Sequence, residues 1–309
     1  MESDSWLGVE LRHLAALQAI AEHGSFGRAA EALGYTQSAV SQQLAQLEKL
    51  VGQRLVERPG GTRPAQLTEA GRMLVLHADA IVARLRAARA DISALAAGEA
   101  GALRVGAFQS AGARLLPQLL RRFSEAWPRV EVSLTEGEDD VLLAALEAGE
   151  LDLAFLVLPV SSGPIETTEL LRDPYVLVTQ ADSPLARRRT PPGFADIARL
   201  PLVGYRACIG ARQVEARMRA AGVEPDFAFR SDDNATIQEM VAAGIGVAVI
   251  PRLTVNEGDS RIALIDLEGR MPPRLIGLAW HRDRYRPPAA EAFVEAARDL
   301  CRELEVAAA

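Results

Sequence analysis

The chain has little of the chemistry that disulfide-stabilised and metal-dependent proteins use. Its 309 residues include two cysteines, four histidines and a single lysine, Lys49. Cys208 and Cys301 make no pair by their spacing, and so small a number of thiols is typical of a reducing cytosol. The histidines are scattered and lack the spacing of a zinc site, so we expect no bound metal.

Long hydrophobic runs and enzyme motifs are also missing. No apolar run is long enough to cross a bilayer, and residues 1–6 have neither the basic nor the apolar part of a secretion signal. The sequence has no Gly-x-Ser-x-Gly elbow and no Gly-x-x-x-x-Gly-Lys loop for phosphate. Its few aromatic residues make no stacking platform for single-stranded nucleic acid. These absences predict a cytoplasmic protein that is not an enzyme, has no cofactor and does not enter a membrane.

Length and charge limit the remaining classes. A chain of 309 residues exceeds what one compact core normally holds, so we expect two or three modules. The formal net charge of −7 argues against a general nucleic-acid coat protein. A sequence-specific DNA-binding protein remains compatible with it, because only one face of such a protein must be positive.

Residues 11–68 have the pattern of a winged helix-turn-helix. Within residues 25–34, apolar side chains recur at the i, i+3, i+4, i+7 spacing of an amphipathic helix, with Ser25 at the N-cap position and Gly34 at the C-terminal left-handed position. Thr36 is expected to cap the next helix, whose apolar stripe runs through Val40, Leu44, Leu47 and Val51. A Gly-Pro-rich ribbon follows, as a wing would require.

The polar face of that second helix indicates contact with DNA. Small or amide side chains gather there and on its flanks, chiefly Gln37, Ser38, Ser41 and Gln42. Small side chains let a helix approach base edges, and glutamine can pair bidentately with adenine. Basic residues surround the helix, and we expect them to contact phosphates rather than form an ordinary solvated surface: Arg28, Lys49, Arg54, Arg58 and Arg63.

A long helix is predicted from Thr68, its N-cap, to about residue 97. Apolar residues recur along it at alternating spacings of four and three, the period of a coiled-coil seam: Leu74, Ala78, Ile81, Leu85, Ala88, Ile92 and Leu95. The alternative is a helix that packs only on its own domain, but so long a seam favours a dimer. The Gly-containing stretch at residues 98–101 then marks a boundary.

Strand and helix patterns alternate from residue 103 to the end. Repeated units of this kind predict an α/β domain with a mainly parallel sheet and helices on both faces. Two such units resemble the two-lobed periplasmic-binding-protein fold. Lobe one would hold about residues 102–160 and 267–309, and lobe two about residues 161–266, with the chain crossing near residues 159–160 and 265–266.

The N-terminal motifs together resemble those of LysR-type transcriptional regulators. The resemblance covers about sixty residues and rests on the spacing of residues 29–33, 36–44, 47–48 and 67–71. It implies a winged helix-turn-helix at residues 1–67, a dimerising linker helix at 68–97 and an effector-binding domain at 102–309. It also implies double-stranded operator DNA and a small-molecule effector as partners, with a homodimer assembling further into a homotetramer. Ser25 would join the DNA-binding residues.

Four loops at strand ends are candidates for the effector site, because ligands of open parallel sheets bind there. They supply Gln109 and Ser110, then Asp139, then Arg206 and Cys208, and finally Asn234. In relatives a residue at the position of Ser110 often meets the effector, although simple helix capping would equally explain it. Asp139 would repel an aromatic acid and favour an amine or polyol, unless it only stabilises a helix N-terminus.

The other three residues have distinct expected roles. Arg206 could clamp a carboxylate, and Asn234 could cap a helix while facing the cleft. Cys208 could act as a redox sensor if Arg206 or a helix end lowered its pKa; otherwise it is a packing residue. Two other functions stay open at this stage: a two-lobed enzyme or binding protein with an added helical domain, and a DNA-binding regulator without an effector.

Overall fold

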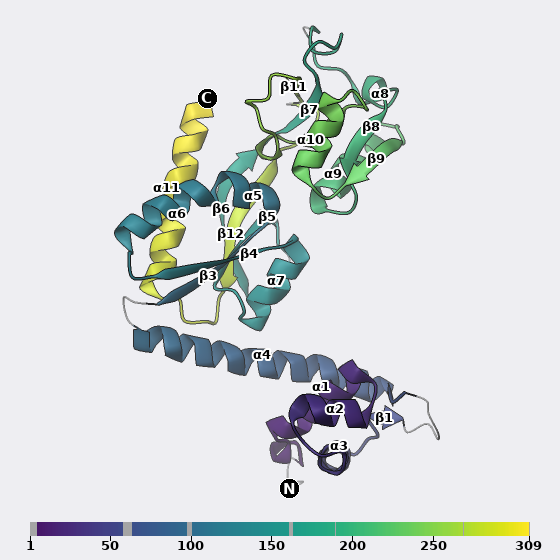
Figure 1. Cartoon of the computed structure of the whole chain (residues 1–309), viewed down its shortest axis with the longest axis vertical. Helices are drawn as coiled ribbons and strands as arrows, with labels where there is room; N and C mark the ends of the chain where they lie inside the picture. The colour runs from purple at the N-terminus through teal and green to yellow at the C-terminus, as the bar shows by residue number, and fades with distance from the viewer. Residues whose placement is uncertain are drawn as a thin grey trace. The chain divides into compact units, whose positions relative to one another are not determined.

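The computed structural model describes the chain except for seven short stretches. The described ranges are residues 5–57, 64–97, 101–160, 163–188, 190–267 and 269–308. The chain divides into two compact units, residues 1–89 and residues 90–309 (Figure 1). None of the helices in the described ranges is long and apolar enough to span a membrane.

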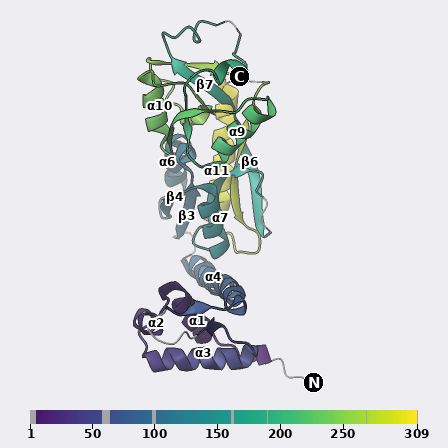
Figure 2. The same ribbon diagram turned by 90° about the vertical axis from the view of Figure 1, so that its right-hand side faces the viewer.

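The first unit is a three-helix bundle followed by a small hairpin. In chain order its elements are η1 (Ser5–Gly8), α1 (Leu11–His23), α2 (Phe26–Leu33), α3 (Gln37–Val51), β1 (Val56–Glu57), β2 (Gln66–Leu67) and the start of α4 (Glu69–Ala97). Figure 2 shows α3 along its length, with α1 and α2 on one side of it. Aliphatic side chains from all of these helices form one core, in which Leu17, Val40 and Leu44 are fully buried. This arrangement confirms the helix-turn-helix that the sequence predicted.

Local residues begin and end these helices as expected. Thr36 caps α3, because its side chain accepts a hydrogen bond from the Ala39 backbone N–H. Gly34 ends α2 with a φ of 67°, in the left-handed region that glycine adopts without strain. Gly71 is required for a different reason. A Cβ built on it would lie 2.0 Å from the Leu55 carbonyl oxygen, so α4 can approach the wing only with glycine there.

The wing is tied to α3 by a single carboxylate. Glu48 Oε1 accepts hydrogen bonds from the backbone N–H groups of Leu55 (2.8 Å) and Val56 (3.3 Å). The strands then pair antiparallel, Val56 opposite Leu67. Residues 58–63 at the tip lie outside the described residues, and so do the predicted phosphate contacts Arg58 and Arg63.

The first part of α4 packs on its own unit, and the next part does not. Leu74 and Ala78 belong to the helix-turn-helix core, as the simple packing alternative required. Further along, Ile81 (44% exposed), Leu85 (46%) and Ile92 (69%) face outward within the single chain. The first part of the predicted seam therefore packs within its own unit, and the later part is exposed.

Lobe one of the second unit is a five-stranded sheet between helices. Its strand order is β4 (Glu131–Glu136), β3 (Ala102–Ala107), β5 (Leu153–Leu158), β12 (Arg274–His281), β6 (Ile165–Asp173). Its helices are α5 (Gln109–Arg114), α6 (Leu116–Ala126), α7 (Asp139–Ala148) and α11 (Pro288–Ala308). The β5 side chains alternate between the two faces: Phe155 packs with α6 and α11, and Ala154 packs with α7.

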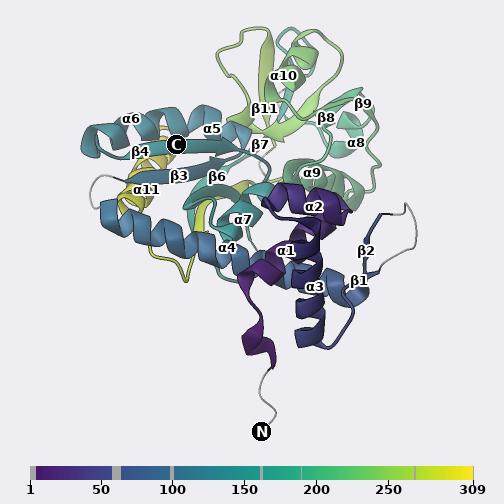
Figure 3. The same ribbon diagram turned by 60° about the horizontal axis from the view of Figure 1, so that its bottom comes forward.

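Lobe two is built around the buried strand β7. Its strands are β7 (Tyr175–Gln180), β8 (Leu202–Tyr205), β9 (Phe227–Ser231), β10 (Ala248–Pro251) and β11 (Ile262–Asp266), and its helices are α8 (Phe194–Ile197), α9 (Ile209–Ala220), α10 (Asn234–Ala242) and the short η2 (Arg252–Thr254). Leu177 packs in a core with α8 and α9, and Val178 packs in another with α10. Figure 3 shows α9 and α10 on different sides of this lobe.

Strand direction and one lobe boundary differ from the sequence interpretation. Strands β3, β4 and β5 are parallel, but β12 runs antiparallel to both of its neighbours, and β7 is antiparallel to β10 and β11. In lobe two β8 and β9 pair parallel, so both lobes mix the two directions, and the expectation of a mainly parallel sheet was wrong. Strand β6 pairs with β12, so residues 165–173, assigned from sequence to lobe two, lie in the lobe-one sheet. The first crossing between lobes thus falls at Pro174 rather than near residue 160.

Candidate DNA-binding face and interlobe site

The outer face of α3 carries the polar residues that the sequence singled out. Gln37, Ser38 and Gln42 are exposed, and Ser41 is half-buried at the flank. On the opposite face Val40, Leu44 and Leu47 are fully buried. The aliphatic edge of α3 therefore holds the bundle together while its glutamine-serine edge stays free to meet another molecule.

The start of α2 lies beside this edge. Ser25 occupies the N-cap position with extended backbone, but its side chain makes no capping hydrogen bond. A Cβ on Gly27 would lie 3.8 Å from Ser25 Oγ and 4.0 Å from Gln37 Oε1, so both polar side chains border the same small residue. Arg28 and Arg54 are exposed. Free helix-terminal N–H groups and guanidinium groups are the usual donors to DNA phosphates.

The second unit has a cleft between its lobes. One cavity of about 330 Å³ lies between the start of α7 and the end of β5 in lobe one and the β8–α9 loop of lobe two. A second, of about 470 Å³, lies between α5 and the η2–α10 side of lobe two. A third, of about 50 Å³, shares residues with both, so the cleft is continuous.

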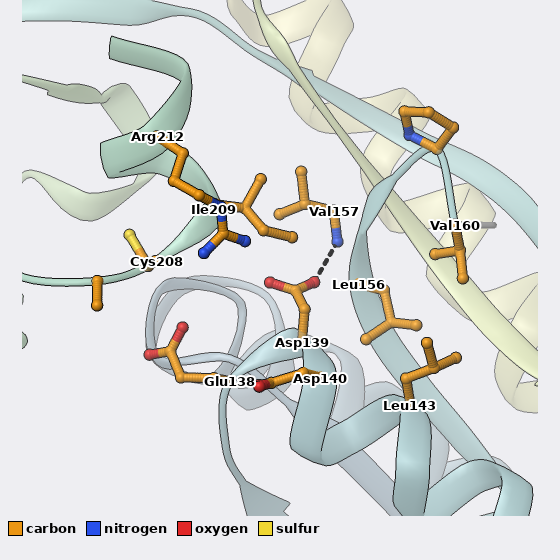
Figure 4. A pocket seen from close by; sticks show the side chains of 12 residues that line it. Glu138, Asp139, Asp140, Leu143, Leu156, Val157, Val160, Cys208, Ile209 and Arg212 are labelled. Carbon is orange, nitrogen blue, oxygen red and sulfur yellow. Dashed lines mark hydrogen bonds between the residues drawn. The ribbon is translucent and has the colours of Figure 1, made fainter. Parts of the chain in front are cut away.

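Asp139 reaches into the first cavity. Its Oδ1 accepts a hydrogen bond of 2.7 Å from the backbone N–H of Val157 on β5 (Figure 4). Burial raises the pKa of this carboxyl, although the Val157 N–H and the charge of Arg274 act in the opposite direction. Glu138, next to it, also has a raised pKa, first because of burial and then because of the charges of Asp139 and Asp232. Two carboxyl groups are thus held partly desolvated in one small space.

Ser110 is part of a buried polar network. Its Oγ accepts a hydrogen bond of 2.7 Å from Arg274 Nη2, and Arg274 Nε donates at 2.7 Å to Asp173 Oδ2. Asp173 Oδ1 also accepts from the Leu253 N–H at 2.9 Å. The Arg274 guanidinium lies 5.1 Å from the Phe108 ring centroid. Ser110 therefore does not cap α5. It lines the second and third cavities while holding a buried guanidinium.

Gln109 forms a direct bridge between the lobes. Its Nε2 donates to Asp233 Oδ2 at 3.0 Å, and its Oε1 accepts from the Asn234 backbone N–H at 2.9 Å. Asp233, rather than Asn234, caps α10 by accepting from the Thr236 N–H. The side chain of Asn234 instead accepts a hydrogen bond of 2.6 Å from the Tyr205 hydroxyl. Gln109 and Asn234 thus meet at the centre of the cleft.

Arg206 and Cys208 differ from their expected roles. Arg206 is exposed, lies 3.6 Å from Asp232 and is absent from the described linings of these three cavities. Cys208 lines the first cavity and caps α9, with its sulfur accepting from the Ala211 N–H. Burial raises the pKa of this thiol, so the lowered pKa that a redox sensor needs is not present. Cys301, the other thiol, is buried in the lobe-one core.

The sequence analysis did not predict three of the charged residues in the cleft. Arg212, one helical turn after Cys208, supplies the cation of the first cavity that we had assigned to Arg206. The i, i+4 spacing on α9 could have indicated this. Glu138 lies beside Asp139 in the acidic stretch 136–140, where the sequence alone does not distinguish one carboxylate from the next. Arg274 precedes an apolar strand, and no local pattern marks it as buried.

Comparison with known proteins agrees with this architecture. Residues 11–72 match the family described as "Bacterial regulatory helix-turn-helix protein, lysR family", and residues 96–302 match "LysR substrate binding domain". The regulator CbbR of Rhodospirillum rubrum is 33% identical over 297 residues, which cover 94% of this chain and 97% of that protein. A probable hydrogen peroxide-inducible genes activator of Mycobacterium avium is 34% identical over 278 residues and 86% of each chain.

The same relationship is seen among solved structures. Full-length CbnR in complex with its target DNA superposes with a TM-score of 0.64 at 26% identity, over 94% of this chain and 99% of that one. A helix-turn-helix joined to a two-lobed ligand-binding domain defines the class of ligand-responsive transcription regulators. The chain belongs to the LysR family of that class.

Proposed function

We propose that this regulator reads operator DNA with the exposed edge of α3 and responds to a small molecule held between the lobes of its second unit. The observation that carries the first part is the division of α3 into a fully buried aliphatic edge and an exposed glutamine-serine edge. An ordinary surface helix would carry mixed charges on that edge instead. The protein would act in the cytoplasm, where its DNA is, and would not be an enzyme.

Each predicted DNA contact has a distinct role. Gln37, Ser38, Ser41 and Gln42 would lie near base edges or adjacent phosphates, and Ser25 would meet the backbone. Arg54, Arg58 and Arg63 would hold flanking phosphates, with the wing reaching the minor groove. The domain division that accompanies this proposal is residues 1–67 for DNA, 68–97 for the linker helix and 102–309 for the effector.

The outward-facing part of α4 supports assembly of the regulator. Ile81, Leu85 and Ile92 would be covered by the same helix of a second copy, because an aliphatic stripe of this length is unfavourable in water. A two-fold dimer would read a partly palindromic site, and further contacts between second units would give a tetramer.

Substitution of Gln37 by alanine tests the DNA-reading proposal. A true base contact contributes about 1–3 kcal/mol of discrimination, so we expect operator affinity to fall about five- to 150-fold while affinity for random duplex changes little. Gln118→Ala, an exposed glutamine on α6, is the matched control. Fluorescence anisotropy with both duplexes measures the effect. Equal loss on operator and random DNA would remove Gln37 from the base-reading set.

The phosphate contacts are tested by their salt dependence. Replacing Arg54 with alanine should weaken binding to all sequences and reduce the slope of log K against log salt by about 1. The same is expected of Arg58→Ala. A variant whose slope equals that of the wild type makes no phosphate contact.

A further inference from the structure

The chemistry of the first cavity indicates which class of effector this chain takes. We propose that the cavity binds a small protonated amine with an aliphatic body, and that Asp139 is its counter-ion. This inference rests on the proposed effector function and names the ligand class for that site. It depends on the direction of the Asp139 side chain, the charge of the lining and the apolar wall.

The direction of Asp139 separates ligand binding from simple stabilisation of a helix end. Glu138, at the N-cap of α7, makes no capping hydrogen bond with its side chain. The Asp139 carboxyl interacts with its own backbone N–H at the start of α7, but it also reaches beyond the helix. Its Oδ1 is held by the Val157 N–H of the neighbouring strand, and the carboxylate lies in the cavity opposite Ile209 and Arg212 (Figure 4). A carboxylate can accept about four hydrogen bonds, so the contact with the Val157 N–H leaves acceptor capacity for a ligand.

The lining is acidic overall. Glu138, Asp139 and Asp140 contribute three carboxylates, and Arg212 is the cation among the described lining residues. The nearby guanidinium of Arg274 is already bound to Asp173 and Ser110. Burial raises the pKa values of Glu138 and Asp139, and the charge of a neighbouring carboxylate, Asp139 for Glu138 and Asp140 for Asp139, acts in the same direction. A carboxylate ligand would add to this repulsion, whereas an ammonium group would relieve it.

The rest of the cavity selects the body of the ligand. Its remaining wall is largely aliphatic and comes from both lobes: Leu143, Leu156, Val157, Pro159, Val160 and Ile209. A volume of about 330 Å³ lies at the small end of the range for ligand pockets. A short hydrocarbon chain fits within it, with one charged end at Asp139. Because α7 and β5 belong to lobe one and Ile209 to lobe two, such a ligand would contact both.

Matched small probes test the proposal on the full-length protein. We would measure binding of n-butylamine, 1-butanol and butyrate by calorimetry and thermal shift. The amine should bind most tightly, the alcohol weakly and butyrate not at all. Asp139→Asn retains an acceptor for the Val157 N–H but removes the charge, and should weaken amine binding about ten- to 100-fold, as expected for loss of a charge-assisted hydrogen bond. Glu125→Gln, an exposed acid on α6, is the charge-matched control and should bind as the wild type does.

Each outcome decides one of the two proposals. Preferential binding of butyrate, or equal amine affinity in the wild type and Asp139→Asn, would overturn the amine assignment but leave an effector site in the cleft. In a Val160→Trp variant the larger side chain narrows the cavity. If this variant still bound the amine as the wild type does, the placement of the amine in this cavity would be wrong. If none of the probes bound, the amine assignment would be wrong. If, in addition, Val160→Trp left the affinity for operator DNA unchanged, the effector proposal would be wrong as well. Glu138→Gln serves as a second variant should Asp139→Asn fail to fold.

Discussion

The buried Arg274–Asp173 pair gives the sharpest test of what stabilises lobe one. Arg274→Met keeps most of the side-chain length while removing the guanidinium from Asp173 and Ser110. Asp173 would then be a carboxylate that is 3% exposed, with the Leu253 N–H among its remaining partners. Removing one partner of a buried pair destabilises by about 3–5 kcal/mol, because the other charge stays in a low-dielectric site.

A control at the opposite end of the same strand provides the comparison. Arg282, which follows β12, pairs with Glu166 at 3.2 Å, but the two side chains are 58% and 45% exposed. Exposed pairs contribute about 0–1 kcal/mol, so Arg282→Met should be nearly neutral. Hydrogen exchange of the β12 amides in the full-length protein reports the stability of lobe one separately from the first unit. We therefore expect much faster exchange for Arg274→Met than for Arg282→Met.

The pH dependence of the stability of Arg274→Met gives an independent check. Burial already raises the pKa of Asp173, and Arg274 opposes that shift. In Arg274→Met the folded-state pKa would rise further above the unfolded value of about 3.9, so the folded state would bind the proton over a wider range. The variant should lose stability as pH rises through that window and regain it in acid. Similar exchange in both variants, or a deficit that does not shrink in acid, would refute the reasoning.

Three other predictions follow from single contacts. Leu85→Asp should dissociate the α4 dimer in sedimentation, whereas Met73→Asp, on an exposed position of the same helix outside the seam, should not; a variant that keeps its mass contradicts the seam. Gln109→Ala removes the two hydrogen bonds that this side chain makes to lobe two and should increase exchange of the α10 N-terminal amides, with an unchanged pattern ruling out a bridging role. Asp139 has a raised folded-state pKa, so the wild type should lose stability as pH rises from about 4 through that pKa. Asp139→Asn should lack this loss in thermal melts, and parallel curves would show that the carboxyl is not desolvated.

The first unit was predictable from sequence because local signals agree there. The caps, the left-handed glycine and the apolar stripe of α3 each point to the same helix boundaries, and the structure confirms Thr36, Gly34 and Val40 in those roles. The exposed polar edge followed directly, since the period of a helix fixes which residues lie opposite a buried stripe.

The cleft was harder because its residues are brought together by topology. Strand β6 alternates weakly and lies at a sheet edge, so nothing in residues 165–173 indicates pairing with a strand a hundred residues later. For the same reason Arg274 gave no signal, although it joins Asp173 and Ser110 over separations of 101 and 164 residues. Loops at strand ends were a sound guide to Gln109, Ser110 and Asp139, but not to Arg212 inside α9.

The free energy of the Gln109 contacts between the lobes is small enough for a small ligand to change the lobe arrangement. The Gln109 bridge consists of two hydrogen bonds: the neutral one is worth about 0.5–1.5 kcal/mol net, and the one to the Asp233 carboxylate about 1.5–3 kcal/mol. A ligand changes the lobe arrangement only by the difference between its affinities for the two arrangements. An ammonium held by Asp139 whose carbon chain touches Ile209 across the cleft would supply a difference of that order, within the 1–3 kcal/mol typical of allosteric coupling. A stronger bridge would require a larger or more highly charged ligand than a cavity of about 330 Å³ admits.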